Sequence, residues 1–178
     1  DFERNTDEYD LYQAYAHIRP LPALQFDLGR QFVNQGFSVE IVDGVLATIS
    51  PSDYLDVILY GGIPRSMEQG DFNKNDGLLT GMSLALRNVT NTNAQLHVAW
   101  RKFNQEISDW GANDQLRLGV NLSHQFGGAA RPNLYGMAEY GVSSRLMEVG
   151  TAGIDLYPTN WFDMNAEFNY FNAPHDTD

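Results

Sequence analysis

The 178-residue sequence has no cysteine, few basic residues and no long apolar segment. The absence of cysteine excludes disulfide scaffolds and metal sites built on thiolates. With 11 basic and 23 acidic residues, the formal net charge is −12, which argues against a nucleic-acid partner. No run approaches the roughly 20 apolar residues that a transmembrane helix requires. The apolar residues must therefore be arranged in another pattern.

That pattern is an alternation of apolar and polar residues with a period of two. It is clearest in residues 114–126 and is repeated in residues 161–171. In the first segment the apolar residues share one parity: Leu116, Leu118, Val120 and Leu122. A period of two predicts β-strands that have one apolar and one polar face.

We expect ten such strands, joined alternately by tight turns and longer loops. The expected strands are residues 9–18, 23–32, 40–50, 54–62, 77–88, 94–104, 114–126, 133–142, 148–157 and 160–171. Pro, Gly, Asn or Asp occur in each tight turn, at residues 19–22, 50–53, 88–93, 127–132 and 158–160. The sequence therefore predicts an all-β, antiparallel up-and-down meander in one domain, residues 1–178. Short turns on one side and long loops on the other are typical of a transmembrane β-barrel.

The expected strand directions also bear on whether the barrel is complete. In outer-membrane barrels the short turns face the periplasm, so both ends of this chain would lie on the outer side. Complete bacterial barrels normally begin and end in the periplasm. The chain also begins with Asp-Phe-Glu-Arg, and not with a Met and a basic, then apolar, signal, so we expect a mature segment or a fragment. We therefore expect an interior fragment of a barrel of about twelve strands or more.

The two parities predict which side chains would face lipid and which would face the lumen. A charge on the lipid face near the middle of the bilayer would cost about 2 to 4 kcal/mol. Apolar residues such as Leu59, Leu84 and Leu96 should therefore face lipid. The lumen-facing candidates have the opposite parity: Gln25, Asp27, Arg87, His97, Arg101, Arg117, Asn121, Asp163, Asn165 and Glu167.

Aromatic residues near the predicted strand ends favour the membrane interpretation, because such residues form interfacial girdles. They are Tyr54, Tyr60, Phe103, Phe126, Tyr157, Trp161 and Tyr170. The alternative is a soluble sandwich or a lipocalin-like barrel, in which the apolar faces meet inside.

A short motif adds a family resemblance. Leu28-Gly29-Arg30-Gln31 is followed after a loop by Asp43-Gly44-Val45. With it the chain resembles large Gram-negative porin-like channels, including the alginate-export-like group, in which such a pair of segments recurs. The resemblance implies a channel in the Gram-negative outer membrane, in contact with the lipid bilayer and lipopolysaccharide.

The same two segments predict an ion pair. A symmetric hairpin centred near Gly36 would place Gly29 opposite Gly44 and Arg30 opposite Asp43. We favour a structural role for this pair over a solute-binding one.

The sequence offers little sign of catalysis or metal binding. The four histidines have no metal-ligand spacing, and there is no nucleophile elbow and no phosphate loop. Asp71, Asn73 and Asn75 alternate as in a calcium loop, but the glycine falls one position late and Met82 replaces the last glutamate. We favour a solvated loop there. We expect no enzyme activity and no cofactor.

The function that these features predict is passive passage of small polar solutes through a polar lumen, with rings of side chains setting selectivity. Three alternatives stay open: a non-conducting barrel that holds a partner protein, a lipid-modifying barrel enzyme, and a soluble binding module. A homo-oligomer is compatible with each of them.

Overall fold

The computed structural model describes residues 13–34, 39–65, 77–103, 114–128, 130–159 and 162–172. These residues contain no helix, and hence none that is long and apolar enough to cross a membrane. They form ten strands: β1 (Ala14–Leu21), β2 (Leu24–Asn34), β3 (Val39–Ser52), β4 (Leu55–Arg65), β5 (Leu78–Val89), β6 (Thr92–Lys102), β7 (Asp114–Gln125), β8 (Asn133–Gly141), β9 (Leu146–Thr159) and β10 (Phe162–Phe171). The predicted number of strands is confirmed.

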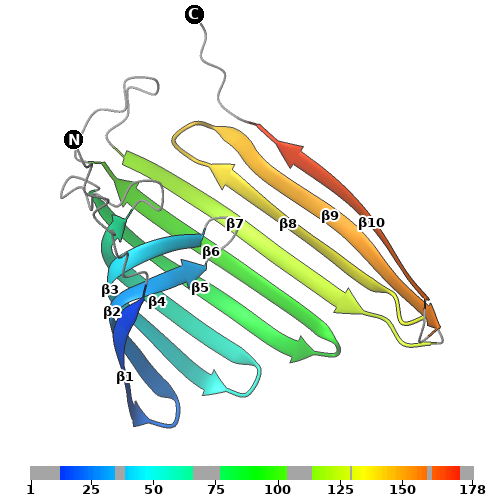
Figure 1. Cartoon of the computed structure of the whole chain (residues 1–178), viewed down its shortest axis with the longest axis horizontal. Helices are drawn as coiled ribbons and strands as arrows, with labels where there is room; N and C mark the ends of the chain where they lie inside the picture. Colours follow the sequence, from blue (N-terminus) through cyan, green and yellow to red (C-terminus); the bar gives the residue numbers. More distant parts are fainter. Residues whose placement is uncertain are drawn as a thin grey trace, which may run out of the picture.

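The ten strands form one antiparallel sheet in which each strand pairs with its neighbours in sequence (Figure 1). The predicted up-and-down meander is therefore confirmed. The sheet is not closed, because β1 and β10 form its two edges. The end at which β1 is joined to β2, and β3 to β4, is called the turn-side end. The opposite end, where β2 leads to β3 and β4 leads to β5, is called the loop-side end.

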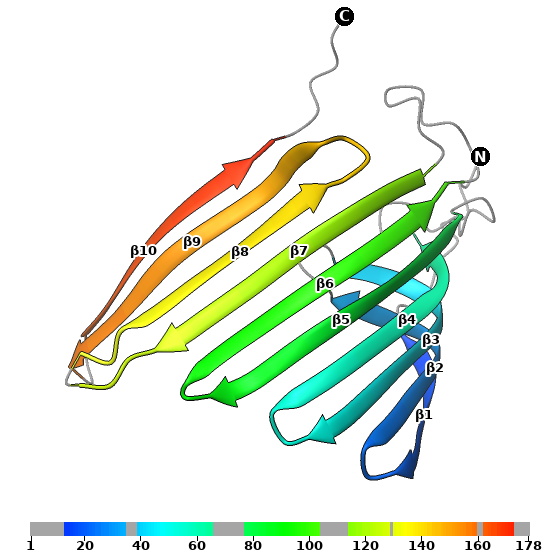
Figure 2. The same ribbon diagram turned by 180° about the vertical axis from the view of Figure 1, so that it is seen from behind.

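The sheet is strongly curved. Parts of β1 to β3 lie in front of β4 to β6 in Figure 1 and behind them in Figure 2, which shows the opposite side. Arg101 on β6 reaches Glu40 on β3, although two strands lie between them. Side chains of such distant strands meet only on the side toward which the sheet bends. Residues of that parity therefore line the concave surface, and the other parity lines the convex surface.

Two predicted turns lie further along the chain than expected. Residues 19–21 belong to β1, and Leu21 pairs with Leu24, so the first turn is at residues 22–23. Ser52 likewise pairs with Leu55, and the second turn is at residues 53–54. Pro20 and Pro51 lie at shifts of strand register, where the missing N–H of proline is tolerated. Proline therefore marks irregular strand ends here, and the turns follow it.

Three glycines allow the bend between β2 and β4. Gly29 pairs with Gly44, and Gly44 pairs with Gly62, so the three lie side by side. A Cβ on Gly44 would lie 2.1 Å from the Gly61 carbonyl oxygen, and Gly29 has a φ of +129°. Only glycine fits such close backbone approach and such a dihedral angle.

The bend brings apolar side chains together on the concave surface. Val33, Val42, Tyr60 and Leu79 form a buried cluster there, each from a different strand. The concave surface therefore carries these apolar side chains in addition to the predicted polar ones. Where the sheet folds on itself, the concave surface excludes water and can bury apolar side chains.

The convex surface carries the predicted apolar residues, and they are exposed. Leu96 is 58% exposed and Leu122 is 53% exposed. The strand registers place five charged residues on this surface, all toward the loop-side end: Arg30, Asp43, Arg65, Lys102 and Asp114. The rest of the convex surface of the described strands has no Asp, Glu, Lys or Arg. We call this part the apolar belt.

Candidate functional site

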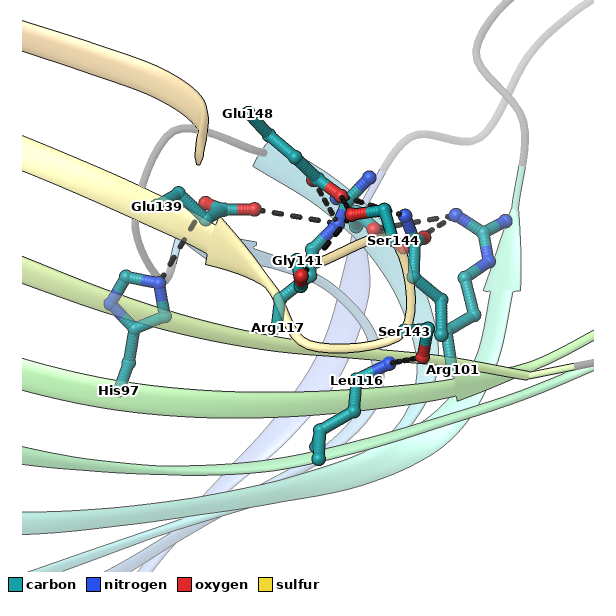
Figure 3. Close-up of polar contacts among 11 residues, drawn as sticks. His97, Arg101, Leu116, Arg117, Glu139, Gly141, Ser143, Ser144 and Glu148 are labelled. Atoms are coloured by element: carbon teal, nitrogen blue, oxygen red, sulfur yellow. Dashed lines mark hydrogen bonds and ion pairs between the residues drawn. The ribbon is translucent and has the colours of Figure 1, made fainter. Parts of the chain in front are cut away.

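A row of charged side chains crosses the concave surface near the loop-side end (Figure 3). Arg101 on β6 pairs with Glu40 on β3, with 3.4 Å between Nη1 and Oε1. Arg117 on β7 has its Nε 2.9 Å from Oε2 of Glu148 and 3.5 Å from Oε1 of Glu139. From β3 to β9 the charges thus run acid, base, base, acid, acid. We call these five residues the charged row.

Glu148 joins this row because of an irregularity in β9. Glu139 pairs with Val149, whereas Tyr140 pairs with Met147, so Glu148 is an extra residue between them. Such a bulge changes the direction of side chains locally. The Glu148 carboxylate accepts hydrogen bonds from Gln115 Nε2 at 3.4 Å and from Ser144 Oγ at 3.2 Å.

His97 lies beside the charged row and is almost fully buried. The His97 side chain is 2% exposed and that of Glu139 is 4% exposed, with 3.7 Å between Nε2 and Oε2. Neither ring nitrogen of His97 makes a hydrogen bond within the described residues. His97 is therefore close enough to Glu139 for an electrostatic interaction but is not held by a hydrogen bond to it.

The ring of His97 lies over Gly119 of the neighbouring strand. A Cβ at Gly119 would lie 1.9 Å from His97 Cε1. Among the described residues the same arrangement occurs three times on the concave surface. Each time the ring is on β4, β6 or β8 and the glycine lies directly opposite on the next strand. The pairs are Tyr60 with Gly81, His97 with Gly119, and Tyr135 with Gly153.

These ring positions correct one prediction. Tyr60 was expected in an interfacial girdle, but it lies on the concave surface and is 6% exposed. Gly81 leaves room for the ring at a position where most side chains would push it outward. Tyr157, expected in the same girdle, lines a hollow on the concave surface. Trp161, also expected there, lies outside the described residues.

Three more of the predicted lumen-facing residues, Gln25, Asp27 and Arg87, take part in polar contacts on the concave surface of β1 to β5. His17 Nδ1 lies 2.6 Å from Asp27 Oδ1, and Gln25 Nε2 donates to Asp27 Oδ2 at 3.2 Å. Arg87 forms an ion pair with Asp56, which is buried. Arg87 therefore compensates the charge of Asp56, and the Asp27 carboxylate is held by contacts with His17 and Gln25.

The predicted residues of β10 join a polar network with β8 and β9. Asn165 Nδ2 donates to Asp155 Oδ1 at 2.7 Å and to the Tyr135 hydroxyl at 3.0 Å. The Tyr135 hydroxyl donates to Glu167 Oε2 at 2.7 Å. Unlike the charged row, these contacts include no arginine or lysine.

Asn121 and Asp163 complete the predicted lumen-facing set. Asn121 Nδ2 donates to Gln95 Oε1 at 3.3 Å, and Gln95 Nε2 donates to Ser83 Oγ at 3.3 Å. Asp163 is exposed near the turn-side end of β10.

Arg30 and Asp43 form the predicted ion pair, and the pair lies on the convex surface. Arg30 Nε donates to Asp43 Oδ1 at 2.6 Å, and Gly29 pairs with Gly44 as the hairpin symmetry predicts. Arg65 Nε also donates to Asp43 Oδ2, at 2.9 Å. The sequence contained no signal for Arg65, because its position depends on the register between β3 and β4.

Three residues of the charged row were missed by the sequence analysis: Glu40, Glu139 and Glu148. Glu139 has the parity of its inward-facing neighbours, and parity could have found it. Glu40 precedes a segment that is apolar on both faces, so its orientation was hidden. The bulge at Glu148 has no sequence signal.

Within the described residues, no three His, Asp or Glu side chains come together as a metal site requires. Asp71, Asn73 and Asn75, the calcium candidates, lie outside these residues. Comparison with known proteins adds no relative: no family model, no curated protein and no solved structure matches this chain.

Proposed function

We propose that this chain forms the wall of a channel in the outer membrane of a Gram-negative bacterium. Small polar solutes would pass along its concave surface, and lipid and lipopolysaccharide would contact its convex surface. The observation that carries the proposal is the distribution of charge. Exposed apolar side chains cover the convex surface, whereas hydrogen-bonded polar and charged side chains dominate the concave surface.

The size of the apolar belt supports contact with a bilayer. On β4 the outward residues from Leu55 to Ile63 include no charge. Eight residue steps of roughly 3.3 Å give a length of roughly 26 Å along the strand. A β-strand that crosses a bilayer at a tilt of about 45° needs roughly 9–11 residues, and positions 55 to 63 are nine residues. A belt of this size in water would expose a contiguous apolar surface far larger than soluble monomers normally carry.

The burial pattern also opposes the soluble alternative. In a lipocalin-like barrel the apolar parity points inward and is buried. Here Leu118 and Val120 point outward and are 45% and 41% exposed, whereas Glu139 points inward and is 3% exposed. Surrounding lipid would cover the outward apolar side chains at little cost in free energy, whereas contact with water would be unfavourable for them.

A non-conducting scaffold is the second candidate, because part of the concave surface is filled. The apolar cluster of Val33, Val42, Tyr60 and Leu79 and the charged row lie at the same end of the sheet. Together the apolar cluster and the charged row narrow the space along the concave surface at the loop-side end. A barrel that is blocked there would hold a partner and would pass no solute.

Reconstitution tests these alternatives directly. The chain is purified in detergent, inserted into liposomes and examined by flotation and by conductance in planar bilayers. We expect the protein to float with the lipid and to give discrete conductance steps in KCl. Stable insertion without conductance would favour the scaffold. A folded monomer in detergent-free buffer would contradict the membrane proposal.

A further inference from the structure

A polar hollow lies on the concave surface at the turn-side end, away from the charged row. Its volume is about 340 Å³, within the range of small-molecule sites. Its lining includes the amides of Asn91, Asn93, Gln125 and Asn133, together with Ser123 and Tyr157. We call it the amide hollow. None of the residues that line it carries a formal charge.

A second hollow adjoins it and has a different character. Its volume is about 370 Å³, and it shares Asn93 and Ser123 with the amide hollow. Ala85, Met137 and Tyr135 contribute an apolar wall and an aromatic ring. The two hollows therefore form one groove, with amides at one end and apolar side chains at the other.

The charged side chains near this groove already have partners within the protein. Arg87, at the edge of the second hollow, pairs with Asp56. The Asp155 carboxylate accepts hydrogen bonds from Asn133 at 3.1 Å and from Asn165 at 2.7 Å. An anionic solute would meet this carboxylate without a free cation among the residues that line the groove.

Free hydrogen-bonding groups line the amide hollow. The side-chain amides of Asn91 and Gln125 make no hydrogen bond within the described residues. Each amide has an oxygen that accepts and an NH₂ group that donates. A hydroxyl group both donates and accepts, so a solute with several hydroxyls complements this set of side chains.

The β5–β6 turn holds these amides in place. Asn88, Thr90 and Asn91 have φ values of 50°, 49° and 61°. The Asn88 backbone N–H donates to Asn93 Oδ1 at 2.9 Å, and the Gln125 N–H donates to the Asn91 carbonyl at 3.0 Å. The turn is therefore connected to β7, which lowers the entropy lost when a ligand binds.

We infer that the groove is a binding subsite for neutral, polyhydroxylated solutes of the sugar class. The amides would bind the hydroxyl groups, and the wall with Tyr135 and Met137 would pack against the C–H face of a sugar ring. This inference rests on the proposed function, because such solutes would bind as they pass along the concave surface. The lack of a free cation in the groove favours neutral sugars over sugar acids.

Calorimetry on the detergent-solubilised chain tests the subsite without requiring conductance. The probes are maltose, glucose and glucuronate. We expect the two neutral sugars to bind and glucuronate to bind more weakly. Gln125→Ala combined with Asn91→Gly should weaken maltose binding about tenfold, because hydrogen bonds are lost. Glycine keeps the positive φ at position 91, so the turn is retained.

Gln25→Ala is the matched control, because Gln25 is an amide on the concave surface outside the groove. It should keep maltose affinity within about twofold of the unmodified chain, and circular dichroism should show that both variants fold. Equal losses in both variants, no loss in either, or preferred binding of glucuronate would overturn the subsite. Conductance without sugar binding would overturn the subsite alone, and sugar binding without conductance would overturn the channel alone.

Discussion

Arg30 and Asp43 face each other across β2 and β3 and are joined by two hydrogen bonds of 2.6 and 2.8 Å. The pair lies on the convex surface, beside the apolar belt, and Arg65 donates to the same carboxylate at 2.9 Å. One carboxylate therefore accepts hydrogen bonds from two arginines at the edge of the surface that we assign to lipid. Removal of this carboxylate should therefore destabilise the folded chain more than the loss of an ordinary surface ion pair does.

The first prediction concerns this carboxylate. Asp43→Asn should destabilise the folded chain in detergent by about 1 to 3 kcal/mol, because two cations lose their charged acceptor. Urea unfolding, followed by tryptophan fluorescence, measures the change. Asp114→Asn is the control, since within the described residues the Asp114 side chain makes only a long contact, of 3.4 Å, with Trp100 on the same surface. Equal midpoints for the two variants would contradict a structural role for Asp43.

The second prediction concerns the ring-over-glycine pairs. Gly119→Ala should destabilise the fold by about 1 to 3 kcal/mol, because the new Cβ would overlap the His97 ring. Gly127→Ala should have little effect, since no atom lies within 4 Å of a Cβ there. Thermal unfolding by circular dichroism compares the two.

A double variant separates the clash at Gly119 from a backbone effect. His97→Ala removes the ring that would meet the new methyl group, so His97→Ala with Gly119→Ala should be more stable than the sum of the two single changes implies. Simple additivity of the two changes would show that the ring is not the cause.

The third prediction concerns the apolar belt. Leu96→Arg places a charge on the convex surface and should reduce the amount of folded protein in liposomes, at a cost of about 2 to 4 kcal/mol near mid-bilayer. Gln95→Arg changes the adjacent residue, which points to the concave surface, and should have a much smaller effect. Protease protection after reconstitution measures both. A larger loss for Gln95→Arg would reverse our assignment of the two surfaces.

The fourth prediction concerns the charged row. Its five residues carry three negative and two positive charges. Arg117→Gln should therefore increase the preference of the channel for cations, and Glu148→Gln should decrease it. The reversal potential across a KCl gradient measures the preference. Because the row would act directly on passing ions, shifts in the same direction for both variants would argue against it.

The sequence alone determined the strands, their number and which residues share a face. These properties follow from local geometry: successive side chains in a strand point to opposite sides, so the alternation around Leu118 and Leu122 could be recognised within one segment. The register of β2 and β3 was also accessible, because the symmetry of one hairpin relates Gly29 to Gly44 and Arg30 to Asp43.

Only the tertiary structure decided which inward residues meet. The contact between Arg101 and Glu40 joins strands that are not neighbours, and it depends on the curvature that the three paired glycines permit. Glu148 enters the charged row through a bulge, which shifts register without a marker in the sequence. Curvature and bulges arise from backbone packing across several strands, and alternation within one strand contains no information about them.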